Sequence, residues 1–255
     1  MKKKIILITG TSGFIGYEFL KFALIKKYTV IDILRYKNKN NKKLNILRRK
    51  YNKSYQSIFF SNHKDLEIKI KKIKVDNFIN FATLYINNHK FINISNLLES
   101  NILFPTMVLD LIHLKTKKTF EIISDYYLSK TNNTKYYNLK LYESFGTNDN
   151  RKKLIPTIIR NYKKSKTTKI LSKSLELNII HVDDIIKAII LIINTNIKSG
   201  SYCIKQKKNT NIYKLIVNIN KKLKKKIKVK YLNKKASIIK KNKLKILPKW
   251  KPTIE

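Results

Sequence analysis

The sequence predicts an α/β fold with a parallel, doubly wound sheet, and two observations support this prediction. Short apolar runs alternate along the first half with segments whose apolar residues recur at helical spacing. A glycine-rich turn also joins the first apolar run to the first helical segment. Alternation of this kind puts helices on both faces of a parallel sheet. In the second half we expect a small C-terminal α/β lobe that completes a pocket over the strand ends.

The first half contains the strands and helices of the expected sheet. Strands are predicted at Lys4–Thr9, Tyr28–Ile33, Ser57–Phe60, Phe78–Ala82 and Thr119–Ser124. Helices are predicted at Phe14–Lys26, Leu66–Ile73 and Asn93–Leu114. The segment Tyr36–Lys53 is basic and rich in asparagine, so we expect a solvated loop there.

The second half is less regular but still alternates between strands and helices. Strands are predicted at Lys135–Tyr142, Ser201–Ile204 and Ile227–Leu232, and helices at Leu154–Lys163, Ile185–Ile193 and Ile212–Leu223. Pro156 is tolerated in the first turn of its helix. Asp183 or Asp184 is expected to cap the helix that follows it. We expect a dinucleotide-binding domain at residues 1–150 and a small substrate-binding lobe at residues 151–255, intertwined as one structural unit.

The turn after the first strand has the layout of a dinucleotide site. It comprises Gly10, Thr11, Ser12, Gly13, Phe14, Ile15 and Gly16. Glycines let the backbone turn tightly and approach a pyrophosphate, and the helix N-terminus offers N–H groups and a positive dipole end. Asp32 ends the second apolar run, roughly 20 residues on, where an acid can bind ribose hydroxyls. Together these features predict a Rossmann-type fold that binds a dinucleotide.

The composition fits a globular protein with a strong positive charge. An apolar fraction of 43% supports a real core. The formal net charge is +42, but lysines are spread over every segment, so we favour biased composition over a nucleic-acid surface. The first apolar run ends at Gly10, too early for a signal peptide, and no run approaches the roughly 18 residues of a membrane span. The single cysteine, Cys203, suits a reducing cytoplasm.

Several conspicuous residues have ordinary structural explanations. His181 lacks partners at ligand spacing, so we expect no metal site. Asp183 and Asp184 fit a helix cap better than a pair of catalytic acids. Cys203 lies in an apolar run and is expected to be a core thiol, and Trp250 is expected to pack the C-terminal tail onto the body.

Further motifs follow the glycine turn in a familiar order. They are Phe81-Ala82-Thr83, Glu99 to Thr106, Ser124, Phe145-Gly146, His181 to Asp184 and Leu247 to Pro252. With the turn and Asp32, they resemble the extended short-chain dehydrogenase/reductase family, the NAD-dependent nucleotide-sugar epimerases and dehydratases. The segment from Tyr137 to Ile155 is most similar to the subgroup of abequose-synthase-like sugar reductases.

The resemblance implies an oxidoreductase or isomerase that uses NAD on a nucleotide sugar in surface-polysaccharide synthesis. By this resemblance it would be an epimerase, a dehydratase or a 4-keto reductase. The turn residues would cradle the pyrophosphate, while Phe81 and Ala82 would line the cofactor. Asp32 would select NAD over NADP, although the nearby Arg35 leaves NADP open as the less favoured cofactor. A homodimer is compatible with the sequence, which does not specify the oligomeric state.

The resemblance also implies a catalytic triad of a hydroxyl, a tyrosine and a lysine. The tyrosine stands four residues before the lysine on one helix, where the ammonium lowers the phenol pKa and makes it a general acid or base. Ser124 is the expected hydroxyl. The first candidate pair is Tyr136 and Lys140, and the alternative pair is Tyr126 and Lys130.

Few residues are available for that helix. Only about twenty residues separate Ser124 from Phe145, whereas a strand uses about seven and a helix a dozen or more. We expect residues 136–142 to form a strand, on which Tyr136 and Lys140 would lie about 13 Å apart. The competing arrangement is a short helix over residues 136–144.

Two more departures from the family agree with a lost helix. Leu177-Asn178 replaces the family's Arg-Asp, and no glycine stands near Lys173. We therefore predict a truncated or degenerate member with weak or absent turnover. The alternative function is a non-catalytic Rossmann protein that binds nucleotides or associates with nucleic acid.

Overall fold

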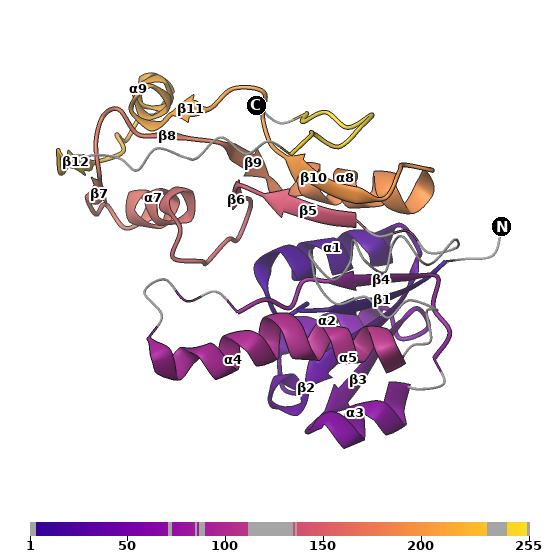
Figure 1. Cartoon of the computed structure of the whole chain (residues 1–255). Coiled ribbons are helices and arrows are strands. Elements are labelled where there is room, and N and C mark those ends of the chain that lie inside the picture. Colours follow the sequence, from indigo (N-terminus) through magenta and orange to yellow (C-terminus); the bar gives the residue numbers. More distant parts are fainter. Residues whose placement is uncertain are drawn as a thin grey trace. The chain divides into compact units, whose positions relative to one another are not determined.

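The computed structural model describes residues 4–70, 73–84, 86, 90–111, 135, 137–233 and 244–253. Packing divides the chain into two compact units, Met1–Tyr136 and Tyr137–Glu255 (Figure 1). This division concerns packing alone, and the functional boundary expected after residue 150 stays a prediction.

The first unit is built on a parallel sheet of four strands. Its order is β3 (Tyr55–Phe60), β2 (Thr29–Arg35), β1 (Ile5–Thr9) and β4 (Asn77–Asn80). The crossovers carry α1 (Phe14–Ile25), the 3₁₀ turn η1 (Tyr36–Asn38), α2 (Lys42–Lys50) and α3 (His63–Ile70). A helical stretch after β4 comprises η2 (Phe91–Asn93), α4 (Ile94–Leu98), the π-helical η3 (Glu99–Leu103) and α5 (Phe104–Leu111). The predicted parallel α/β fold is confirmed, while the expected strand at residues 119–124 lies outside the described residues.

The two faces of this sheet are covered by different helices. On one face Leu7 and Ile33 pack with Leu66 of α3 and Phe104 of α5. Because side chains alternate along a strand, Val30 and Asp32 lie on the other face. There the hydroxyl of Thr11, in the turn before α1, donates to Asp32. The glycine turn therefore stands at the carboxyl end of β1, the end at which open α/β sheets bind ligands.

The prediction of a loop at Tyr36–Lys53 was wrong, because most of this segment is helical. Asn41 is the N-cap of α2, and its side chain accepts a hydrogen bond from the backbone N–H of Leu44. Leu44 and Leu47 are both buried, at a spacing of three residues that puts them on one side of the helix. A capping residue and two core leucines are enough to form a helix whose remaining residues are mostly lysine and arginine.

The described residues of the second unit form short strand pairs and three helices. The parallel pairs are β5 (Tyr137–Leu141) with β10 (Gly200–Ile204), β6 (Glu143–Phe145) with β9 (Ile179–His181), and β7 (Thr168–Ile170) with β12 (Val229–Tyr231). The antiparallel pair is β8 (Glu176–Leu177) with β11 (Thr210–Asn211). The helices are α7 (Leu154–Lys163), α8 (Val182–Asn194) and α9 (Ile212–Lys222). None of the helices in the described ranges is long and apolar enough to cross a membrane.

The start of α8 differs from the prediction. The N-cap is His181, whose Nδ1 accepts the backbone N–H of Asp183, so neither aspartate caps the helix. Asp184 is instead fully buried and binds the C-terminal segment through the backbone N–H and the hydroxyl of Thr253. The Nε1–H of Trp250 donates to the backbone oxygen of Asp184, which confirms that this tryptophan packs the tail. Cys203 is a buried free thiol, as expected.

Candidate functional site

A side chain would meet different neighbours at each of the three glycines of the turn. Gly10 has φ of +75°, and a Cβ there would lie 2.4 Å from the backbone N of Ala82 and the backbone C of Phe81. A Cβ on Gly16 would lie 2.4 Å from the backbone O of Gly10. At Gly13 a Cβ would meet that same oxygen at 3.2 Å and no other atom of the described residues within 4 Å. Gly10 and Gly16 are thus needed for the turn itself, whereas a single backbone oxygen stands close to Gly13, which leaves room there for a ligand.

The N-terminus of α1 faces this open space without a capping side chain. Its N-cap is Gly13, which makes no side-chain cap hydrogen bond, and its first turn contains no acidic residue. Ser12 and Gly13 are exposed, whereas Thr11 and Gly16 on either side are buried. Because the first N–H groups of a helix and its dipole favour an anion, this arrangement fits a pyrophosphate group.

The segment after β4 lies against the glycine turn. The backbone N–H of Phe81 donates to the backbone O of Thr9, and the Phe81 ring lies 5.4 Å from that of Phe19 on α1. Asn80 accepts hydrogen bonds from the hydroxyl of Thr9 and from the backbone N–H of Ala82. These bonds hold Phe81 and Ala82 at the carboxyl ends of β1 and β4, where they are able to line a cofactor.

Asp32 lies inside the unit rather than at its surface. Its side chain is 0% exposed, and its Oδ2 accepts the hydroxyl of Thr11 at 2.5 Å and that of Tyr55 at 2.9 Å. Its Oδ1 is buried without a hydrogen-bond partner among the described residues. Burial raises the pKa of this carboxyl from 3.8 to about 7, against the opposing effects of the Thr11 and Tyr55 hydrogen bonds and the charge of Arg48.

Arg35 is the residue that ends β2 at the ligand side of the sheet. Its side chain is 42% exposed, and its Nη2 lies 3.4 Å from Oε1 of Glu99. The Nε2 of His63 lies 3.5 Å from the same carboxylate oxygen. These long, partly exposed contacts leave the guanidinium accessible to another anion.

Of the five predicted catalytic residues, only Lys140 lies among the described residues. Ser124, Tyr126, Lys130 and Tyr136 all lie outside the described residues. Lys140 is exposed on β5, where it is opposite Cys203 of β10. The strand expected over residues 136–142 is confirmed for Tyr137–Leu141, and the competing short helix over residues 136–144 is wrong. Lys140 therefore does not stand on a helix one turn after a tyrosine.

Sequence reasoning missed a polar cluster in the second unit. The Arg151 guanidinium binds both carboxylate oxygens of Asp149 and also donates to the backbone oxygen of Ser144. Asn178, at the position where the resemblance expects an Arg-Asp pair, is 4% exposed. Its side chain bonds with the backbone N–H and O of Gln206. The asparagine has the structural task of fastening the chain after β10.

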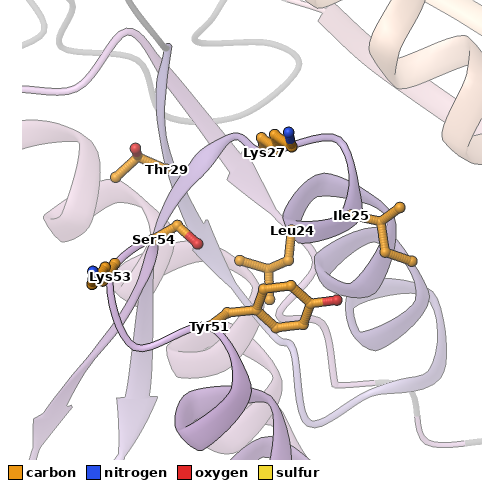
Figure 2. A pocket seen from close by; sticks show the side chains of 7 residues that line it. All are labelled: Leu24, Ile25, Lys27, Thr29, Tyr51, Lys53 and Ser54. Carbon is orange, nitrogen blue, oxygen red and sulfur yellow. The ribbon is translucent and has the colours of Figure 1, made fainter.

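A surface hollow in the first unit lies away from the glycine turn. Leu24, Tyr51 and Ser54 are among the residues that line it (Figure 2). These residues stand where α1 and α2 end and β2 and β3 begin. Ligands of this fold bind at the opposite, carboxyl end of the strands, so we assign the hollow no role in cofactor binding.

The sequence matches the NAD dependent epimerase/dehydratase family over residues 6–124 and 115–204, most of the chain. The chain belongs to this family. The resemblance to extended short-chain dehydrogenases is thereby confirmed, and the cofactor of the NAD dependent epimerase/dehydratase family is NAD. Among the described residues, the glycine turn and the uncapped N-terminus of α1 have a geometry that fits its pyrophosphate.

Two kinds of relatives accompany this family match. A CDP-abequose synthase from Yersinia pseudotuberculosis is 28% identical over 226 residues, which are 77% of this chain and 75% of that protein. A UDP-N-acetylglucosamine 4-epimerase from Methanobrevibacter ruminantium has the same fold, with a TM-score of 0.74 at 20% identity over 99% of this chain and 94% of its own. A UDP-glucuronic acid 4-epimerase from Bacillus cereus, solved with NAD, has a TM-score of 0.75 at 17% identity, over 98% and 95%.

Proposed function

We propose that the chain binds NAD(H) at its glycine turn and acts on a nucleotide sugar, as an epimerase, dehydratase or 4-keto reductase of surface-polysaccharide synthesis. The observation that supports this most is the open space beside Gly13, in front of the uncapped N-terminus of α1. A dinucleotide pyrophosphate needs such a space, because its oxygens must approach backbone N–H groups closely.

Each part of the proposed site has a separate task. When bound, NAD would accept on its nicotinamide the hydride that the sugar loses, or NADH would donate the hydride that the sugar gains. The turn binds the pyrophosphate through its backbone, and the steric need for Gly10 and Gly16 keeps that backbone in shape. Phe81 and Ala82 cover the cofactor from the adjacent strand end, where hydrogen bonds to Asn80 and Thr9 hold them.

The substrate is proposed to be a sugar linked to a nucleoside diphosphate. The name of the CDP-abequose synthase relative supports a cytidine diphosphate sugar. The names of two structural neighbours favour uridine diphosphate sugars, but their identities of 20% and 17% support the fold alone. We therefore favour the cytidine nucleotide.

Binding of NADH tests the proposal. The fluorescence of NADH is titrated with wild-type protein and with Gly13→Asp, which fills the open space and adds a negative charge. Wild-type binding that the variant loses is expected. Equal binding by the two proteins contradicts the proposal. Asn218→Asp, on the exposed surface of α9 in the second unit, adds the same charge away from the turn and is the control.

A second candidate function is nucleotide binding without turnover, and the position of Lys140 on a strand favours it. If such a protein bound nucleic acid, the binding would depend on the net charge of +42. The salt dependence of binding discriminates between a CDP-sugar and a nucleic acid as the ligand. Binding of a CDP-sugar should survive 300 mM salt, about the concentration at which counterion-driven binding to single-stranded DNA has fallen by orders of magnitude.

We also propose that the chain forms a homodimer through its α4–η3 face. Ile94, Leu98 and Ile102 recur every four residues there and are 39%, 51% and 40% exposed. Phe91 before them is 89% exposed. Apolar residues in this arrangement are typical of a covered surface. Light scattering should give a dimer mass for the wild type and a monomer mass for Leu98→Glu, and a wild-type monomer would rule the proposal out.

A further inference from the structure

A hydrogen bond joins the glycine turn to the buried carboxyl group of Asp32. Thr11, the second residue of the turn, is 0% exposed, and its hydroxyl donates to Oδ2 of Asp32. The same oxygen accepts the hydroxyl of Tyr55 at the start of β3. Three segments far apart in the sequence, the turn, β2 and β3, thus meet at one oxygen atom.

The position of Asp32 along β2 keeps it away from a bound ribose. Asp32 pairs with Ile8 of β1, and β2 continues for three residues to Arg35. Ligands of this fold lie beyond the carboxyl ends of the strands, at the level of Arg35. A fully buried carboxylate three residues earlier faces the interior of the unit, where Thr11 is the only part of the turn that bonds to it among the described residues.

We infer that Asp32 is a positioning residue that holds the glycine turn through Thr11 and does not contact the cofactor. The inference rests on the proposed function, because it assigns Asp32 a task in NAD(H) binding. It replaces the expectation that this acid binds the ribose hydroxyls.

Burial of a carboxyl group costs desolvation free energy, which hydrogen bonds and a nearby positive charge offset at Asp32. Those that face it are the hydroxyl of Thr11 from the turn, Tyr55 on β3 and Arg48 on α2. Burial and the charge of Asp32 in turn raise the pKa of Tyr55, so this phenol stays a donor at neutral pH. An apolar residue would fill the same place without a desolvation penalty. The presence of a carboxyl group at this buried position is therefore best explained by its hydrogen bond to the glycine turn.

A fastened turn binds its ligand more tightly than a loose one. Every residue that must be ordered on binding subtracts from the affinity, so order that exists beforehand adds to it. One buried hydrogen bond is worth about a factor of ten in an equilibrium. Loss of the Thr11–Asp32 bond should therefore weaken the affinity for the dinucleotide by about tenfold.

The inference is tested with variants that remove or keep the bond. Thr11→Val and Asp32→Val remove it, whereas Thr11→Ser and Asp32→Asn retain a donor and an acceptor. Val30→Ala is the matched control, because Val30 lies on the same face of β2, is equally buried and has no bond to the turn. Two quantities are measured on the full chain: hydrogen exchange of residues 10–16 without cofactor, and the affinities for NADH and for NADPH.

We expect Thr11→Val and Asp32→Val to speed exchange in the turn and to weaken both dinucleotides by about the same factor of ten. Thr11→Ser, Asp32→Asn and Val30→Ala should keep wild-type affinity. The double variant Thr11→Val/Asp32→Val should bind no more weakly than either single variant, because both changes remove one interaction.

Three outcomes would overturn the inference. Unchanged exchange and affinity in Thr11→Val would show that the bond does not hold the turn. An Asp32→Asn variant that loses NADH affinity but keeps NADPH affinity would make Asp32 a ribose ligand. Additive losses in the double variant would mean that Thr11 and Asp32 act separately. Failure of the proposed function is distinguishable, since a wild type that binds no dinucleotide would still show faster exchange in Thr11→Val.

Discussion

Asp32 should make the stability of the first unit depend on pH, and the structure gives the sign. The folded chain holds the Asp32 proton up to about pH 7, whereas the unfolded chain loses it near the ordinary value of 3.8. Between these values the folded state binds more protons, so stability falls as pH rises. The stabilising effect is complete below pH 3.8 and is lost as pH passes about 7.

The size of this effect follows from the two pKa values. A rise from 3.8 to about 7 corresponds to about 4 kcal/mol, at about 1.4 kcal/mol for each tenfold change in proton affinity. Asp32→Asn cannot titrate and should lack this dependence. The stability of the variant relative to wild type should therefore rise by about 4 kcal/mol between pH 4 and pH 8, about a thousandfold in protection from hydrogen exchange.

Native-state hydrogen exchange of the β1 amides is the appropriate assay, because the only tryptophan, Trp250, lies in the second unit. Asp65→Asn is the control. The partly exposed Asp65 has its pKa lowered by the side chain of Lys69 and the backbone of Ser61. Its contribution is lost only as pH falls below its ordinary value, so its profile should parallel wild type above pH 4. A profile for Asp32→Asn that also parallels wild type would show that Asp32 does not titrate between pH 4 and pH 8.

Three further predictions concern the cofactor, the C-terminal tail and turnover. Arg35→Ala should lower NADPH affinity about tenfold and leave NADH affinity unchanged in a fluorescence titration, because a guanidinium at the end of β2 can contact only the extra phosphate of NADPH; equal effects on both would contradict this. Asp184→Ala should destabilise the second unit by about 3 kcal/mol in urea unfolding followed by tryptophan fluorescence, because the hydrogen bonds from Thr253 lose their buried acceptor; a loss within error would show that the tail is not held there. Turnover of CDP-sugars with NADH, followed at 340 nm, should be weak or absent; a robust rate abolished by Tyr136→Phe or by Tyr126→Phe would identify the working tyrosine.

The sequence predicts the regular parts of this fold well, because local patterns determine them. The glycine turn, the apolar strands around it and the helix Leu154–Lys163 stand where periodicity puts them. The segment Tyr36–Lys53 fails for a local reason as well. Its helix depends on Asn41, Leu44 and Leu47, and this short signal is obscured by the surrounding lysines and asparagines.

The environment of Asp32 was beyond the reach of sequence patterns. Its spacing from the glycine turn predicts a ribose ligand, since spacing says how far along the chain an acid lies but not how deep. Its depth is set by the pairing of β2 with β1 and β3, which brings Tyr55, 23 residues away, against the same carboxylate. The N-cap of α8 was missed for a similar reason. An aspartate is the commoner cap, and only the geometry of β9 puts the ring of His181 over the first turn.

A crystal structure of the full chain grown with NADH is the decisive experiment for the glycine turn. We expect pyrophosphate oxygens within hydrogen-bond distance of the backbone N–H groups of the turn beside Gly13, with Asp32 still bonded to Thr11 and Tyr55. A dinucleotide bound elsewhere, for example in the hollow lined by Leu24 and Tyr51 (Figure 2), would show that the turn is not the cofactor site.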